Sequence, residues 1–143
     1  MKTQEHLNAL LADYQVLYQK LRSYHWNVRG PMFFELHVKF EELYTGTAVT
    51  VDDLAERLLA IDAKPISTLQ GALEVARLKE DAGDIGAQEM VANLVDDFRA
   101  LNDSLRAASK AAEEEGDNTS FNLLEGIADA QEKTAWMLRS YLG

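Results

Sequence analysis

Histidine and carboxylate side chains recur at helical spacing in the first half of the sequence. His37 is followed four residues later by Glu41, and Asp52 is followed four residues later by Glu56. Residues four apart lie on one face of a helix, so each pair can direct two side chains toward the same ion. Imidazole nitrogen and carboxylate oxygen suit iron, manganese and zinc. Each pair is therefore a candidate for half of a metal site, and His25 lies twelve residues before the first pair.

The two pairs share one stripe of a predicted helix but lie far apart along its axis. With His37 at 0°, Glu41 falls at about 40°, Asp52 at about 60° and Glu56 at about 100°. Glu41 and Asp52 are about 16 Å apart at a rise of about 1.5 Å per residue, whereas metal ligands lie within about 2–2.5 Å of their ion. Another helix of the chain, or a second copy lying antiparallel, must complete each half. Glu-x-x-His pairs, which mark di-iron sites inside one bundle, are absent. The spacing therefore favours a site shared across a two-fold interface.

The composition restricts the chemistry that such a site can perform. There is no cysteine among the 143 residues, which excludes disulfides, thiolate catalysis and thiolate-bound metals. The formal charge is −10, with 24 acidic residues against 14 basic ones. This charge repels nucleic acids and anionic membranes and attracts cations. Metal ions are therefore the expected small partners.

The elements that must position these residues are helices. Hydrophobic residues recur every three or four positions along nearly the whole chain, and there are only two prolines. This pattern predicts three long helices at about 3–28, 33–61 and 85–115. A fourth follows a cap at Asp117, Asn118 or Thr119 and runs to about 141. The connection over 62–84 contains the short amphipathic stretch "LQGALEVARL" and is long enough to cross a bundle. We therefore predict one all-α domain over residues 1–143, a ferritin-like four-helix bundle with a long crossover and a short extra helix.

The stretch "YHWNVRGPMFFELHVKFEELY", together with the later "VDDLAERLLAI", resembles the Dps family, the mini-ferritins. The resemblance extends over most of the chain in helix order, helix length and crossover. It implies that the ferroxidase ligands are His25, His37, Glu41, Asp52 and Glu56, both as metal ligands and as catalytic residues. Family members often have aspartate at the position of Glu41, so this carboxylate extends one methylene further.

The resemblance also implies a function. It implies an iron-storage and detoxification protein in which twelve subunits form a hollow shell. Fe(II) would be oxidised at two-fold interfaces, preferably by hydrogen peroxide, and the Fe(III) product stored as mineral inside. Iron is thus the expected ion, with up to two ions per site, although zinc, manganese or cobalt could occupy the site without turnover. The expected activity is that of a ferroxidase.

Several other residues have two possible roles. Trp26 could pack in an interface or core, or serve as an oxidisable group near the iron. Glu125, Asp129 and Glu132 share one face of the last helix; by resemblance they could line a three-fold pore, or they could form an ordinary exposed face. Asn122 stands near a position where family pores often have an acid. We expect His6 at the surface.

Two alternative functions belong to other classes, a DNA-binding protein that protects the nucleoid and a structural bundle without turnover. Lys2 is the only lysine before the first predicted helix, and the last predicted helix runs to about 141. We therefore expect no lysine-rich tail and no direct DNA binding through one. The segment "MKTQEHLNALLADYQ" has neither the basic start nor the apolar stretch of a signal peptide, and no window resembles a membrane helix. We therefore expect a cytoplasmic protein without a membrane partner.

Overall fold

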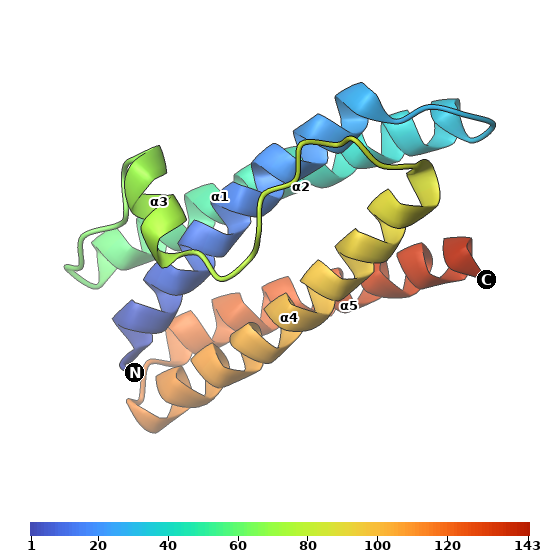
Figure 1. Ribbon diagram of the computed structural model, residues 1–143. Coiled ribbons are helices and arrows are strands. Elements are labelled where there is room, and N and C mark those ends of the chain that lie inside the picture. The colour runs from blue at the N-terminus through green and yellow to red at the C-terminus, as the bar shows by residue number, and fades with distance from the viewer.

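The computed structural model describes residues 1–143, and its regular structure consists of five helices without a strand. Two helical hairpins lie side by side, one made of α1 and α2 and the other of α4 and α5 (Figure 1). The helices are α1 (Thr3–Asn27), α2 (Phe33–Ala60), α3 (Leu69–Val75), α4 (Ala87–Glu114) and α5 (Asn118–Leu142). The predicted all-α bundle is confirmed. No helix combines the length and the sustained hydropathy needed to cross a membrane.

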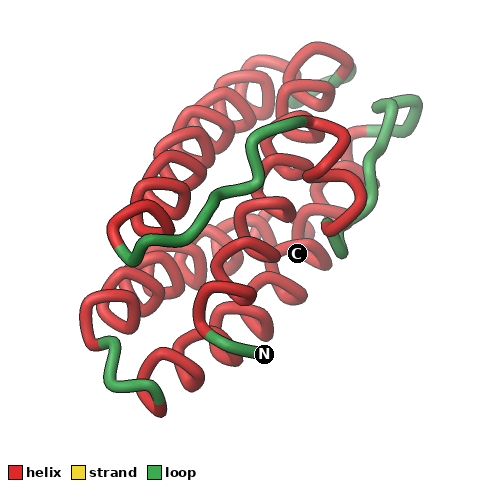
Figure 2. Tube along the Cα trace, turned by 90° about the vertical axis from the view of Figure 1, so that its left-hand side faces the viewer, coloured by secondary structure: helices red, strands yellow, loops and turns green.

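The connection between α2 and α4 carries the chain from one end of the bundle to the other. It runs along the outside of α1, and α3 interrupts it and packs against α1 (Figures 1 and 2). The buried carboxylate of Asp13 in α1 accepts hydrogen bonds from the backbone N–H groups of Arg77 and Leu78, at 2.6 and 3.1 Å, and from the Arg77 guanidinium. This carboxylate therefore holds the crossover on α1.

The predicted limits of the long helices agree with the structure to within two residues. Side-chain caps mark the starts of two of the five helices. Thr68 accepts the N–H of Gly71 and begins α3, and Asp117 accepts the N–H of Ser120 and begins α5. The short helix ends at Val75 rather than continuing through "LQGALEVARL". It stops because Asp13 takes the N–H groups at its predicted end.

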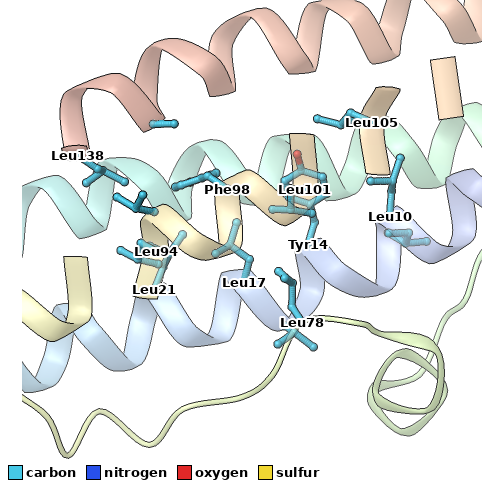
Figure 3. Packing of buried hydrophobic residues seen from close by; sticks show 14 of the residues in the cluster. Leu10, Tyr14, Leu17, Leu21, Leu78, Leu94, Phe98, Leu101, Leu105 and Leu138 are labelled. Carbon is cyan, nitrogen blue, oxygen red and sulfur yellow. The ribbon is translucent and has the colours of Figure 1, made fainter. Parts of the chain in front are cut away.

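The core consists of 26 buried hydrophobic residues that come from the four long helices and the crossover. The apolar residues that recur at helical spacing along α1 are all buried except Tyr18, which is half-buried; the buried ones are Leu7, Leu10, Leu11, Tyr14, Leu17 and Leu21. Figure 3 shows the α1 side chains packing against those of α4, with Leu78 of the crossover on the other side of α1. His6, expected at the surface, is half-buried, and this burial lowers its pKa. The core thus holds α1 and α2 in the register on which the candidate site depends.

Candidate metal centre

The two histidines of the opening motif lie against each other where α1 ends and α2 begins. Their rings are stacked with centroids 3.7 Å apart and planes 12° from parallel. Nδ1 of His25 lies 2.6 Å from the backbone oxygen of His37, and Nδ1 of His37 lies 2.7 Å from the backbone oxygen of His25. A carbonyl oxygen can only accept, so each Nδ1 carries the hydrogen and donates it. In the neutral ring, Nε2 then keeps its lone pair and can bind a metal.

A tight turn between the two helices brings the histidines together. Gly30 has a φ of 110°, a conformation that side chains with a Cβ rarely adopt, and its carbonyl accepts the N–H of Phe33 at 3.0 Å. The turn reverses the chain within a few residues, so that His25 in the last turn of α1 meets His37 in the second turn of α2. The segment "NVRGP" therefore determines which residues of α1 and α2 lie opposite each other.

Two aromatic rings hold the histidine pair in place. Phe33 is stacked on His37 with centroids 4.9 Å apart, and Tyr44 packs edge-on against His25 at 5.4 Å. Sequence reasoning did not include either ring in the site. Phe33 lies four residues before His37 and Tyr44 seven after it, so both share a helix face with this histidine. This spacing could have predicted that both rings lie near the site.

One carboxylate of the predicted set lies beside the pair. Glu41 Oε1 is 3.6 Å from His25 Nε2, and the Glu41 side chain is exposed. One chain therefore brings together a buried imidazole (His25), a half-buried imidazole (His37) and an exposed carboxylate. No three histidine or acidic side chains of one chain converge closely enough to hold an ion.

The other two predicted ligands form a separate acidic pair further along α2. Asp52 and Glu56 are both exposed and form no ion pair within the chain. A hydrogen bond with Asp52 and the negative charge of Asp52 raise the pKa of Glu56, as expected for two carboxylates one turn apart. The neighbouring Arg57 is bound instead to Asp117 and Ser120, at 2.9 and 2.8 Å. This acidic pair is thus free to receive a cation.

The remaining candidate residues lie on the surface of the chain. Trp26 is 56% exposed, so it is not part of the core of this chain, and the Arg22 guanidinium lies over its ring at 4.9 Å. The three candidate acids of α5, Glu125, Asp129 and Glu132, are all exposed. Glu132 lies 3.8 Å from the guanidinium of Arg106 in α4. Their roles stay predictions.

Comparison with known proteins identifies the family of the chain. A family model of the ferritin-like domain matches residues 4–143. The DNA protection during starvation protein of Brevibacillus brevis is 46% identical over 136 residues, which cover 95% of this chain and 91% of that protein. The fold and the family model thus define a ferritin-like protein.

Solved structures identify the group of ferritin-like proteins to which the chain belongs. Dps from Staphylococcus aureus is 41% identical with a TM-score of 0.97, covering 99% of this chain and 95% of that one. The Dps protein of Vibrio cholerae O1 is also 41% identical, with a TM-score of 0.96 and coverage of 99% and 89%; it is described as a member of a superfamily of ferritin-like diiron-carboxylate proteins. The chain belongs to the Dps proteins of the ferritin-like family, which confirms the family predicted from the sequence.

Proposed function

We propose that the chain is the subunit of a cytoplasmic iron-storage and detoxification protein that oxidises Fe(II) at sites shared by two copies. His25, His37 and Glu41 of one subunit would bind the ion together with Asp52 and Glu56 of the partner subunit. The observation that carries the proposal is the reciprocal hydrogen bonding of the two histidines, because it leaves both Nε2 atoms free as ligands. Membership in a family with a diiron-carboxylate relative supports iron as the substrate.

The register of α2 supports a shared site. In an antiparallel pair of α2 helices centred between Gly46 and Thr47, His37 lies opposite Glu56 of the partner subunit. Glu41 then lies opposite Asp52 of the partner subunit. Both couples have the same four-residue spacing, so they meet without an offset. One rotation thus completes two identical sites, as a two-fold axis requires.

The exposed apolar residues of α2 lie on the same stripe. Phe34 is 78% exposed and Leu59 is 59% exposed. In the register described above they face each other across the two-fold axis, outside the two ligand pairs. Ala48 near the centre falls at about 20° on the same stripe, and its small side chain lets two helices approach closely. Large exposed apolar groups on a water-soluble surface are typical of an interface. A partner subunit would cover these groups.

The ligand set fits the proposed reaction. Carboxylate oxygens are hard ligands and favour Fe(III), the product, while the imidazoles also bind Fe(II). The fixed Nδ1–H donors orient both rings, so little reorganisation is needed when the ion binds. Two Fe(II) ions can together give hydrogen peroxide the two electrons that reduce it to water, which avoids release of hydroxyl radical. We further propose that a hollow shell of twelve subunits stores the Fe(III) mineral.

A second function, direct DNA binding, is suggested by the name of the Brevibacillus brevis relative. The net charge of −10 opposes it, because phosphate binding needs cationic side chains. We propose instead that DNA would be protected by removal of iron and peroxide. A gel shift at physiological salt that persists in the presence of a chelator would favour direct binding.

The test of the ferroxidase proposal combines oxidation kinetics with assembly. The protein is loaded anaerobically with Fe(II), mixed with peroxide, and the absorbance of the ferric product is followed by stopped flow. We expect oxidation faster than in protein-free solution, together with sedimentation as a large oligomer. Oxidation at the protein-free rate would refute the activity, and a monomer would refute the shared site.

A further inference from the structure

A groove runs between α2 and α5, on a side of α2 that the candidate metal centre does not use. Two adjoining hollows form it, with volumes of about 320 and 200 Å³, and they share the lining residues Lys39, Leu43 and Thr134. The larger hollow alone is in the size range of small-molecule sites, about 300–1,000 Å³. Lys39 and Gly46, which line it, fall at about 200° and 180° on the helical wheel that places the ligand stripe between about 0° and 100°. A partner subunit on that stripe therefore leaves the groove open.

The floor of the groove is polar and buried. Tyr14 of α1 is 3% exposed and Gln131 of α5 is 6% exposed, and both line the larger hollow. Nε2 of Gln131 donates to the backbone oxygen of Phe98 at 3.3 Å and to Oδ1 of Asn102 at 2.9 Å. Because both amide hydrogens are used there, Oε1 of Gln131 accepts the hydrogen of the Tyr14 hydroxyl. The two oxygens of the floor thus keep lone pairs but have no hydrogen left for a ligand.

The threonine hydroxyls of the groove use their hydrogens in the same way. Thr47, Thr50 and Thr134 each donate to the backbone oxygen four residues earlier, at 2.8, 3.3 and 3.3 Å. All three line the larger hollow. Every hydroxyl group that lines this hollow therefore presents lone pairs only, and a polar ligand must supply the hydrogens.

The charged residues that line the groove leave one negative charge uncompensated. Lys39 Nζ lies 2.8 Å from Oε2 of Glu42 and neutralises this carboxylate. Glu35, which lines the smaller hollow, is exposed and forms no ion pair. Apolar side chains, including Leu43 and Leu138, line the groove between the hydroxyl groups and Glu35. The groove thus combines hydrogen-bond acceptors, an apolar wall and a free carboxylate.

We propose that this groove binds a linear aliphatic diammonium ion, with one ammonium group on the acceptors of the floor and the other at Glu35. A primary ammonium group carries three N–H donors, and such amines stay protonated at neutral pH, as lysine does. The methylene chain between the two groups covers the apolar wall. Leu43 and Glu35 are about 12 Å apart along the axis of α2, at about 1.5 Å per residue, which is close to the length of an eight-carbon diamine. This inference does not depend on the proposed ferroxidase function.

The probe is octamethylenediamine, and equilibrium dialysis against the assembled, iron-free protein measures how much of it each subunit binds. We expect one diamine per subunit in the parent and loss of binding in Gly46→Leu, whose added side chain fills the groove. A Cβ at Gly46 meets no atom within 4 Å, so this substitution does not disturb the core. Gly126→Leu is the matched control and should bind like the parent, because its Cβ also meets no atom within 4 Å and it lines neither hollow. Ala130→Leu fills the groove from α5 and tests the same point if Gly46→Leu does not fold.

Two further comparisons distinguish a built site from general attraction of cations to an acidic surface. The bis(trimethylammonium) analogue of the probe keeps both charges but has no N–H donor, so it should bind at least about tenfold more weakly. Glu35→Gln should weaken diamine binding by about twofold to fivefold, as expected for an exposed ion pair. Equal binding of the two ligands, an unchanged affinity in Glu35→Gln, or binding that survives both groove-filling variants would overturn the inference. So would a parent that binds no diamine.

Discussion

His25 and His37 fix each other's orientation, because each imidazole donates from Nδ1 to the backbone carbonyl of the other residue, at 2.6 and 2.7 Å. This reciprocal pair joins the last turn of α1 to the second turn of α2. It leaves Nε2 of each neutral ring without a hydrogen, and Nε2 is the atom that we propose as the ligand. A change in the turn between the helices should therefore alter metal binding even though no ligand is lost.

Replacement of Asp52 by Asn and of Glu56 by Gln should abolish fast Fe(II) oxidation and leave the oligomer intact. The substitutions remove two anionic ligands while they keep side-chain size and helix propensity nearly unchanged. Stopped-flow absorbance after mixing with peroxide measures the rate, and sedimentation confirms assembly. The comparison is with protein-free solution, because iron and peroxide also react directly. A double variant that assembles and matches the parent would identify these carboxylates as an ordinary exposed face.

Two inactive variants should restore activity when they assemble together. His37→Ala removes a ligand from one half of the site, and the Asp52→Asn/Glu56→Gln variant removes the other half. In a mixed two-fold pair, one site receives both intact halves and the other receives none. Random assembly should therefore recover about a quarter of the parent sites.

Co-expression with two different affinity tags isolates the mixed oligomer for this test. Each variant assembled alone is the control and should remain at the background rate. A mixed oligomer with no recovery would mean that every ligand of a site comes from one chain.

Gly30→Ala should weaken metal binding and destabilise the fold by about 1–2 kcal/mol, because a Cβ is strained at positive φ. The added Cβ meets no atom within 4 Å at this position, so the effect would come from the backbone alone. Co(II) absorbance and urea unfolding measure the two effects. Gly126→Ala is the matched control: its Cβ also meets nothing, and it lies within α5, so it should not destabilise. Equal behaviour of the two variants would contradict a strained turn.

The charge of Asp117 should stabilise the fold above about pH 4 and lose this effect in acid. Burial alone would raise the pKa of Asp117, but the hydrogen bonds from Ser120 and the nearby Arg57 lower it on balance. A group with a lowered pKa in the folded state contributes stability above its unfolded value, near 3.8, and loses it as the pH falls through the folded value.

Asp117→Asn isolates this contribution, since asparagine caps a helix about as well as aspartate. Urea unfolding of both proteins as a function of pH is the measurement. The stability difference should be largest near neutral pH and shrink toward pH 3. A difference that stays constant over this range would show that the charge makes no contribution.

The sequence by itself determined the helices and the stripe of α2 that carries Glu41, Asp52 and Glu56, because helical periodicity is a local property of the chain. The histidine contacts were not predictable in this way. Whether His25 meets His37 depends on the reversal at Gly30, since one residue of slip would rotate the His25 ring by about 100° away from α2.

Only the tertiary structure decided two further features. Asp13 appears as an unremarkable acid within an apolar helical stripe, yet it is buried and ends α3 through N–H groups 64 and 65 residues away. Tyr44 joins the histidine pair because two helices pack together. Contacts between residues so distant, or on different helices, arise only when the core positions both elements. Local sequence patterns therefore do not predict these contacts.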